Sequence, residues 1–141
     1  MRIYLDFDGV LHPVNSPQQN FVHLPSLEAL LRENPGIEVV ISSSWRAVFS
    51  EEYIKDHFFS EHVANRIVGV TPIFRELTRY DEILVHIQQT GYEGDFIVID
   101  DEPHQFPSGW PPLLICNPDE GLNAEKIEEL KGRIFSVSTK R

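Results

Sequence analysis

The chain has 141 residues, of which 41% are hydrophobic and 24% are charged, as is typical of a soluble globular protein. This length is enough for one hydrophobic core and short for two, so residues 1–141 are expected to form a single domain. The net charge of −10 argues against a broad surface for nucleic-acid backbones, because no basic face can form. A bound divalent cation would still allow an anionic substrate, since it reverses the charge locally.

The sequence contains no sign of a membrane segment or a secretory signal. No apolar run approaches the ~20 residues that cross a bilayer, and the chain begins directly with a strand-like run. Its one cysteine, Cys116, rules out an internal disulfide and is typical of a reducing compartment. We therefore expect a cytoplasmic protein in which Cys116 is a small core residue.

Short apolar runs alternate with helix-like stretches along the chain. Five runs predict β-strands, at residues 2–6, 37–44, 66–70, 95–101 and 112–116. Helical spacing of apolar residues predicts four helices, at residues 24–36, from Trp45 to a break near residues 58–60, at 79–91 and at 123–134. Apolar strands separated by helices are typical of a parallel sheet covered on both faces. The sequence therefore predicts an α/β fold, a three-layer open sandwich around a mostly parallel five-stranded sheet.

Several residues mark the expected ends and faces of these helices. Ser26 is a possible N-cap of the first helix, and Asn123 is a plausible N-cap of the last. Gly91 is expected to end the third helix. The apolar pattern of that helix places three residues on one face, namely Ile83, Leu84 and Ile87.

Polar side chains follow three of the predicted strands, at the point where each strand ends. They are Asp6 and Asp8, residues 42–44 (SSS), and Asp100 and Asp101. Ligands bind at the carboxyl ends of parallel strands, where the strand order reverses, so we expect these side chains to converge. Two ionised carboxylates ~4 Å apart repel by roughly 4 kcal/mol at an effective dielectric constant near 20. Such a cluster requires a cation, and oxygen ligands alone favour a hard ion such as Mg²⁺.

Each of these features also has a purely structural interpretation. Asp101 or Glu102 could cap a short helix that follows the fourth strand. The serines at residues 42–44 could cap the next helix, and Asp8-Gly9 could be only a tight turn. We favour the functional interpretation because all three features occur at the ends of strands in one predicted sheet.

Three segments resemble motifs of the haloacid dehalogenase (HAD) superfamily. Residues 4–12 (YLDFDGVLH) are similar to its first motif, an apolar strand followed by Asp-x-Asp, a glycine and a small apolar residue. Residues 39–44 (VVISSS) resemble the second motif, and residues 96–101 (FIVIDD) resemble the fourth, a strand closed by paired acids. The third motif, a basic residue at the start of a helix, fits Arg79, with Arg75 as a competitor. The resemblance implies a Rossmann-like HAD fold over nearly the whole chain.

The resemblance also implies a role for each polar side chain. Asp6 would be the nucleophile that forms an aspartyl-phosphate, and Asp8 would protonate the leaving oxygen and then activate water. Ser43, or Ser42 if the register differs by one residue, would hydrogen-bond the transferring oxygens, and Arg79 would offset the phosphoryl charge. The substrate-binding residues are expected to be Ser42, Ser44 and Gly9.

A Mg²⁺ site is implied by the same resemblance. Asp6, Asp101 and the backbone carbonyl of Asp8 would hold the ion, while Asp100 would orient Arg79 or a metal-bound water. An ion that bridges the carboxylate and the phosphate removes the repulsion between them.

The leading interpretation is a Mg²⁺-dependent phosphatase. Superfamily members that cleave carbon–halogen bonds have no alcohol to protonate and generally lack an acid at the position of Asp8. The connection between the first two motifs leaves space for a short flap and no sizeable cap. Capless members resemble enzymes that act on exposed phosphoesters, so the expected partner is a phosphorylated small molecule or macromolecule. A phosphotransferase and a catalytically inactive phospho-ligand binding module are the alternatives.

Two histidines and an aromatic loop lie beside the motifs in the sequence. His12 follows the first motif and His104 the fourth, and each either lines the mouth of the site or is an ordinary loop histidine. Residues 103–112 (PHQFPSGWPP) form either a wall of the substrate site or a loop that packs its own aromatic side chains, Phe106 and Trp110.

Overall fold

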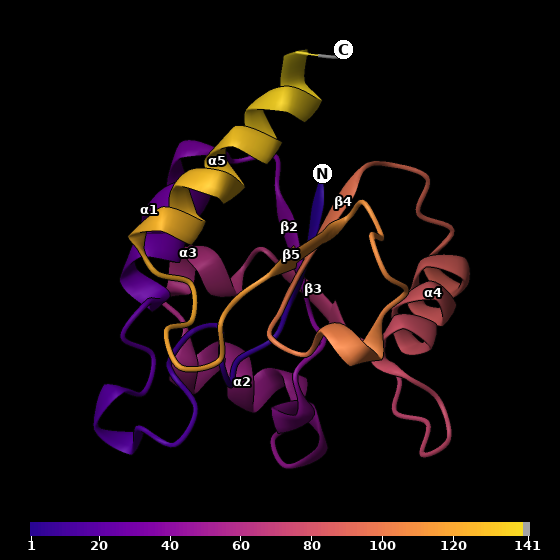
Figure 1. Cartoon of the computed structure of the whole chain (residues 1–141), viewed down its shortest axis with the longest axis horizontal. Coiled ribbons are helices and arrows are strands. Elements are labelled where there is room, and N and C mark those ends of the chain that lie inside the picture. Colours follow the sequence, from indigo (N-terminus) through magenta and orange to yellow (C-terminus); the bar gives the residue numbers. More distant parts are fainter. Residues whose placement is uncertain (140–141) are drawn as a thin grey trace.

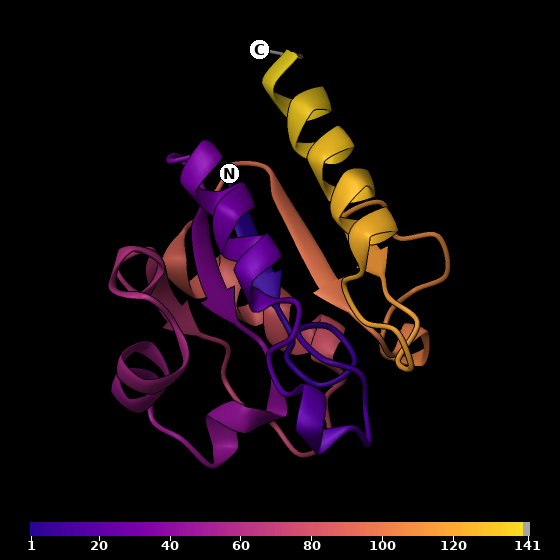
Figure 2. The ribbon, with the colours of Figure 1, turned by 90° about the vertical axis from the view of Figure 1, so that its left-hand side faces the viewer.

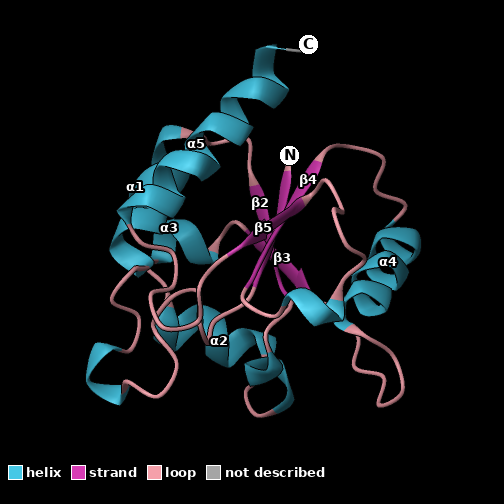
Figure 3. Ribbon diagram, in the orientation of Figure 1, coloured by secondary structure: helices cyan, strands magenta, loops and turns pink. Residues whose placement is uncertain are grey.

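The computed structural model describes residues 1–139 and has the predicted α/β architecture (Figures 1 and 3). A five-stranded sheet has the order β3-β2-β1-β4-β5. Its strands are β1 (Arg2–Leu5), β2 (Glu38–Ile41), β3 (Ile67–Val70), β4 (Phe96–Asp100) and β5 (Leu113–Ile115). Every neighbouring pair of these strands is parallel, so the sheet is wholly rather than mostly parallel.

Helices cover both faces of the sheet. The α-helices are α1 (Leu24–Glu33), α2 (Glu51–Phe58), α3 (Glu61–Ala64), α4 (Arg79–Thr90) and α5 (Ala124–Thr139). Short 3₁₀ helices are η1 (Pro17–Gln19), η2 (Ser44–Ala47) and η3 (Pro103–Gln105). Helices α1 and α5 lie side by side over one face, and α4 covers the other (Figures 1 and 2). This is the predicted three-layer sandwich, and its described residues include no inserted cap between the strands.

The two layers of packing follow from the alternation of side chains along the strands. Ile3 and Leu5 of β1 belong to the larger apolar cluster, which includes residues of α1 and α5. Tyr4, between them in the sequence, belongs to a smaller cluster with Val98 of β4 and Ile83 of α4. Strands buried on both faces explain why their sequences read as continuous apolar runs.

The strand order reverses at β1, which lies between β2 and β4. The chain runs from β1 to β2 and β3 on one side, and then crosses to β4 and β5 on the other. Leu5 is in register with both Ile41 and Ile99. The residues directly after these three positions therefore meet at one edge of the sheet, where such folds bind ligands.

Three predicted helix ends are confirmed in the structure. Thr78 and Asp81 form a capping box at the start of α4, which Gly91 ends in the left-handed conformation with φ of 64°. Asn123 caps α5, because its Oδ1 accepts a hydrogen bond from the Lys126 backbone N–H at 3.0 Å. Cys116 is fully buried just after β5, as expected.

Two expectations about the helices were wrong. Helix α1 begins at Leu24 with His23 as its N-cap, two residues before Ser26. Pro25 is tolerated there because the N–H groups of a first helical turn have no partner within the helix. Leu84 is 38% exposed, whereas Ile83 is fully buried, because Leu84 lies at the edge of the stripe that faces the sheet.

The stretch after Trp45 is also more divided than expected. It consists of η2, α2 and α3 in place of one helix with a single break. The break near residues 58–60 is confirmed, and an earlier one falls at Ser50, whose Oγ accepts the Tyr53 backbone N–H at 3.1 Å and caps α2. Among the helices of the described part of the chain, none has the length and hydropathy to span a membrane.

Candidate active site

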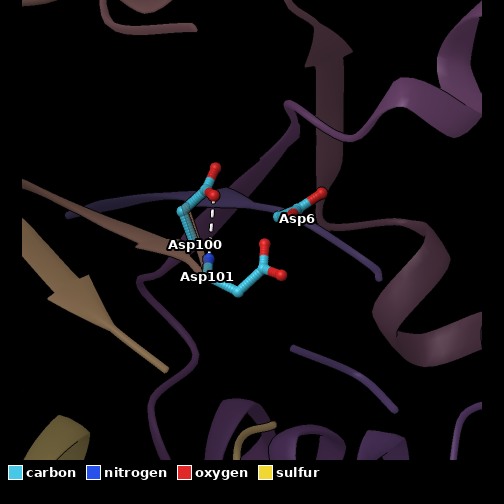
Figure 4. Close-up of side chains that lie close together, drawn as sticks. All are labelled: Asp6, Asp100 and Asp101. Carbon is cyan, nitrogen blue, oxygen red and sulfur yellow. Dashed lines mark hydrogen bonds between the residues drawn. The ribbon is translucent and has the colours of Figure 1, made fainter. Parts of the chain in front are cut away.

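Three carboxylates gather at the carboxyl edge of the sheet, and we call them the acidic cluster. Asp6 follows β1, Asp100 is the last residue of β4, and Asp101 comes next. One oxygen from each side chain lies within 4.8 Å of the other two. Figure 4 shows these three side chains close together. Asp6 and Asp100 are buried and Asp101 is half-buried. The predicted convergence of acids from separate strands therefore occurs.

Arg79 is the cation beside the acidic cluster. Its Nη1 lies 2.9 and 3.0 Å from the two Asp100 oxygens and 3.0 Å from Oε2 of Glu102, and 3.8 Å from Oδ2 of Asp6. The capping box of α4 places Arg79 at the first position of the helix. Arg75, the competing candidate, is exposed in the preceding loop.

Burial and like charges shape the electrostatics of the acidic cluster. Burial raises the pKa of Asp6 well above its ordinary value, and the neighbouring Asp100 carboxylate raises it further. Burial also raises the pKa of Asp100 to about 6, although Arg79 opposes this shift. Burial disfavours the charged form of Arg79, but the carboxylates around it outweigh that effect and raise its pKa.

The acidic cluster therefore suits a hard cation. Three carboxylates share one nearby guanidinium group, so ionisation of all three would leave the cluster with excess negative charge. Its donors are all oxygens, which Mg²⁺ prefers. Asp6 and Asp101 are the members that could hold such an ion, because Asp100 is already bound to Arg79.

Gly9 is fitted against the acidic cluster. Its φ of +74° is a left-handed conformation, and a Cβ added there would lie 2.1 Å from Oδ2 of Asp101. The Val10 N–H donates to the carbonyl of Phe7 at 3.1 Å and closes a turn with Asp8 and Gly9 at its centre, so the tight turn considered for Asp8-Gly9 is present. The structure thus gives a steric reason for glycine at position 9, whereas a contact between Gly9 and the substrate stays a prediction.

The three serines after β2 have different environments. Ser42 is in register with Asp6 by extension of the Leu5–Ile41 pair, and its buried Oγ has no hydrogen-bond partner among the described residues. Ser43 is also buried, and its Oγ accepts the Trp45 backbone N–H at 3.2 Å. Ser44 is exposed. The capping alternative is therefore confirmed for Ser43, and Ser42 is the serine with a free hydroxyl beside Asp6.

Asp8 lies apart from the acidic cluster and has its own partners. Its side chain is 49% exposed, and its Oδ1 lies 2.8 Å from Nε2 of His12. Its Oδ2 accepts a hydrogen bond from Nε1 of Trp45 at 3.0 Å. We call these three side chains the Asp8 clamp. His12 is buried, so it lies behind Asp8 and not in the mouth of the site.

Some contacts of the site were not expected from the sequence. Glu102 precedes η3 but makes no side-chain cap bond, and it pairs with Arg79 instead. The backbone N–H groups of Asp101 and Glu102 both donate hydrogen bonds to Oδ1 of Asp100. The acceptor is therefore Asp100 and not the side chain of Asp101. Gln105 Oε1 accepts the Arg79 backbone N–H at 2.9 Å. The capping roles considered for Asp101 and Glu102 were wrong, because the charge of Arg79 draws Glu102 toward it.

The loop at residues 103–112 packs on itself. Phe106 is buried and stacks on Trp110 with ring centroids 5.8 Å apart. Trp110 meets Tyr80 edge-on at 4.9 Å. His104 is exposed. The structural interpretation of the aromatic side chains in this loop is therefore confirmed.

The fold and the site together define the class of the protein. A parallel sheet whose strand order reverses at β1, acids after β1 and β4, and a basic residue that opens α4 are features of the HAD superfamily. A family model described as "HAD domain in Swiss Army Knife RNA repair proteins" matches residues 2–127, and the chain belongs to that family. Membership supports a hydrolase of the phosphatase type. Comparisons with curated proteins and with solved structures gave no significant match.

Proposed function

We propose that this chain is a Mg²⁺-dependent phosphatase that hydrolyses phosphate monoesters through an aspartyl-phosphate on Asp6. The observation that carries the proposal is the approach of Asp6, Asp100 and Asp101 within 4.8 Å of one another, beside Arg79. The matching family model supports the same general chemistry. Residues 1–141 would act as one catalytic domain.

Asp6, Asp101 and the backbone carbonyl of Asp8 are the proposed ligands of Mg²⁺. Their oxygen donors fit this ion, and the crowding of negative charge supports a role for it. When bound, Mg²⁺ would neutralise negative charge on the phosphoryl oxygens and so allow an anionic nucleophile to approach.

Two displacements at phosphorus make up the proposed reaction. An Asp6 oxygen attacks phosphorus, the bond from phosphorus to the ester oxygen breaks, and Asp8 donates a proton to the departing alcohol. Water then attacks the phosphorus of the aspartyl-phosphate and loses a proton to Asp8. The bond between Asp6 and phosphorus breaks, which releases inorganic phosphate and restores both carboxyl groups.

Arg79 and a serine after β2 are the proposed partners of the phosphoryl oxygens. The positive charge of Arg79 lies 3.8 Å from Asp6, and the bonds from Asp100 and Glu102 fix its direction. Ser42 and Ser43 both remain candidates for the hydrogen bond to the phosphoryl oxygens. Ser42 is favoured because its hydroxyl has no other partner among the described residues. Ser44 and Gly9 are proposed to line the substrate site.

The proposed substrate class is an exposed terminal phosphate, and RNA ends are the first to test. The family description places such HAD domains in RNA repair proteins. The net charge of −10 argues against extensive contacts with an RNA backbone, so the proposed recognition is confined to the terminal phosphate. A cytoplasmic location is part of the proposal, because the sequence has a single cysteine, Cys116.

Phosphate release tests the proposal directly. The substrates are 4-nitrophenyl phosphate and short RNA oligonucleotides with a 5′- or a 3′-phosphate, each assayed with Mg²⁺ and with EDTA. We expect Mg²⁺-dependent release of inorganic phosphate that Asp6→Asn abolishes. Release that survives this substitution would overturn the role of Asp6. Transfer of phosphate to an added alcohol would indicate a phosphotransferase, and binding without turnover would indicate an inactive module.

A further inference from the structure

The carboxylate of Asp8 is held by two N–H donors that come from different parts of the chain. His12 follows Asp8 in the same turn, and its Nε2 lies 2.8 Å from Oδ1. Trp45, in η2, donates its indole N–H to Oδ2 at 3.0 Å. Both oxygens of a half-exposed carboxylate are therefore bonded to neighbours that hold it in one orientation.

Backbone geometry fixes the tautomer of His12. The Phe21 backbone N–H donates to Nδ1 of His12 at 3.2 Å, so this nitrogen is the acceptor and the ring proton is on Nε2. His12 Nε2–H is then the donor to Asp8. Phe21 reaches this position with a φ of 60°, a conformation that non-glycine residues adopt rarely and at a cost.

Aromatic packing makes the two donors rigid. The Trp45 ring contacts Phe7, Phe21 and Phe58 with centroids 5.3 to 5.4 Å apart, and it lies 5.7 Å from the His12 ring. His12 and Trp45 thus each have a ring that packs among aromatic side chains and a ring nitrogen that reaches Asp8. This combination of apolar body and polar tip positions a hydrogen bond well.

We infer that His12 and Trp45 are positioning residues that orient Asp8 for proton transfer. The inference rests on the proposed function, in which Asp8 is the acid and base. A carboxylate has about four lone-pair sites, and the two donors take one on each oxygen. The remaining sites can exchange a proton with the leaving oxygen or with water. The clamp therefore sets which direction Asp8 presents to the substrate.

The clamp has a specific consequence for the substrates that the enzyme can hydrolyse. An ester whose leaving group is a strong base needs a proton from Asp8 as its bond breaks, whereas a dinitrophenolate departs without one. Misorientation of Asp8 therefore slows the first kind of ester alone. The constant kcat/KM reports steps up to formation of the phosphoenzyme, so it is independent of the later role of Asp8 as base.

Matched variants test this inference with phenyl phosphate and 2,4-dinitrophenyl phosphate. Trp45→Phe removes the N–H and keeps the packing, and His12→Met removes the other donor. His12→Gln keeps an N–H at a similar reach and is the rescue variant. Phe58→Leu disturbs the same aromatic cluster without touching Asp8 and is the control.

We expect kcat/KM for phenyl phosphate to fall about ten- to a hundredfold in Trp45→Phe and His12→Met, a part of the roughly 10²–10⁴-fold that general acid–base catalysis contributes. The value for dinitrophenyl phosphate should change little, and His12→Gln should recover most of the loss. Equal losses on both substrates would mean that these residues only maintain the fold, and would overturn the inference.

A direct measurement of the tautomer completes the test. The ¹⁵N shifts of His12 in the folded wild-type protein should show a protonated Nε2 and an unprotonated Nδ1, and the opposite assignment would contradict the clamp. Failure of the proposed function has a different signature, because wild-type protein would then release no phosphate from either ester. An active wild type whose variants keep the substrate ratio would overturn the clamp alone.

Discussion

The acidic cluster and the Asp8 clamp each contain an aspartate from the segment that follows β1, and they have opposite electrostatic character. In the acidic cluster, buried carboxylates oppose one another, and the pKa of Asp6 is raised well above its ordinary value. In the Asp8 clamp, a half-exposed carboxylate receives an N–H donor on each oxygen. Asp6 and Asp8 are two residues apart in the sequence. A nucleophile crowded by other carboxylates and a proton carrier with an N–H donor on each oxygen can therefore lie only two residues apart in one chain.

Substitution of Asp6 should separate activity from stability most clearly. Asp6→Asn removes the nucleophile, so the rate should fall to background, while the melting temperature of the metal-free protein should rise by a few degrees because a buried charge is lost. Asp8→Asn, the matched variant, should lower both the activity and the melting temperature. Its amide oxygen can accept from one of the two donors, but its NH2 group would face the other donor and leave it without an acceptor. Phosphate release and thermal unfolding measure the two effects. A lower melting temperature for Asp6→Asn would contradict the repulsion that we assign between Asp6 and Asp100.

Gly9→Ala should damage the acidic cluster through backbone and steric effects together. The left-handed conformation costs a non-glycine residue about 1–2 kcal/mol, and the added Cβ would collide with the Asp101 carboxylate. We expect near-complete loss of Mg²⁺-dependent activity and a melting temperature lower by several degrees. Gly36→Ala is the control, since a Cβ there meets nothing within 4 Å. Full activity of Gly9→Ala would show that Asp101 can move without consequence.

Addition of Mg²⁺ should stabilise the wild-type protein by relieving the repulsion in the acidic cluster. Binding at a concentration 100 times the dissociation constant raises the free energy of unfolding by about 2.7 kcal/mol. Asp101→Asn should lose most of this stabilisation, whereas Asp56→Asn, an exposed carboxylate on α2, should retain it. Thermal unfolding across a Mg²⁺ titration provides the measurement. Equal responses of both variants would argue against Asp101 as a ligand.

The pH dependence of stability should be the smallest of these effects. An Asp pKa of 3.8 in the unfolded chain and about 6 for Asp100 in the folded protein means that the folded state binds the proton more tightly. The stability from this group is therefore fully present below pH 3.8 and lost as pH rises through 6. The metal-free wild type, relative to Asp100→Asn, should lose about 2 kcal/mol from pH 4 to 7. Chemical denaturation at each pH measures this difference, and a constant difference would contradict it.

The sequence was informative about the acidic cluster because strand ends in a parallel sheet share one edge. Asp6 and Asp100 are placed by short apolar runs that are easily recognised, and the observed register of Leu5 with Ile99 brings them together. Arg79 was predicted from the resemblance to the third motif, with Arg75 as a competitor, and the capping box that places it at the start of α4 was found only in the structure. Local patterns therefore predicted the fold and the acids of the site, and the family resemblance supplied its basic residue.

The Asp8 clamp could not be predicted in this way. Trp45 is 37 residues from Asp8, and its contact depends on how a 3₁₀ helix packs against the turn after β1. The donor to His12 is a backbone N–H, which leaves no mark in the sequence. The pairing of Glu102 with Arg79 was missed because Glu102 directly precedes Pro103, a position that also suits a helix cap. Contacts that depend on packing between distant segments are thus where sequence patterns failed.

The bond between Phe21 and His12 has a consequence for natural variation in this family. Because the donor belongs to the main chain, exchange of side chains in the connecting loop cannot delete it, and only proline at residue 21 would remove the hydrogen. Substitutions in the loop of this chain that leave its backbone conformation unchanged should therefore preserve the same imidazole tautomer. Selection on this feature would act on loop length and on the shape of the turn, and alignments that score residue identity alone would overlook it.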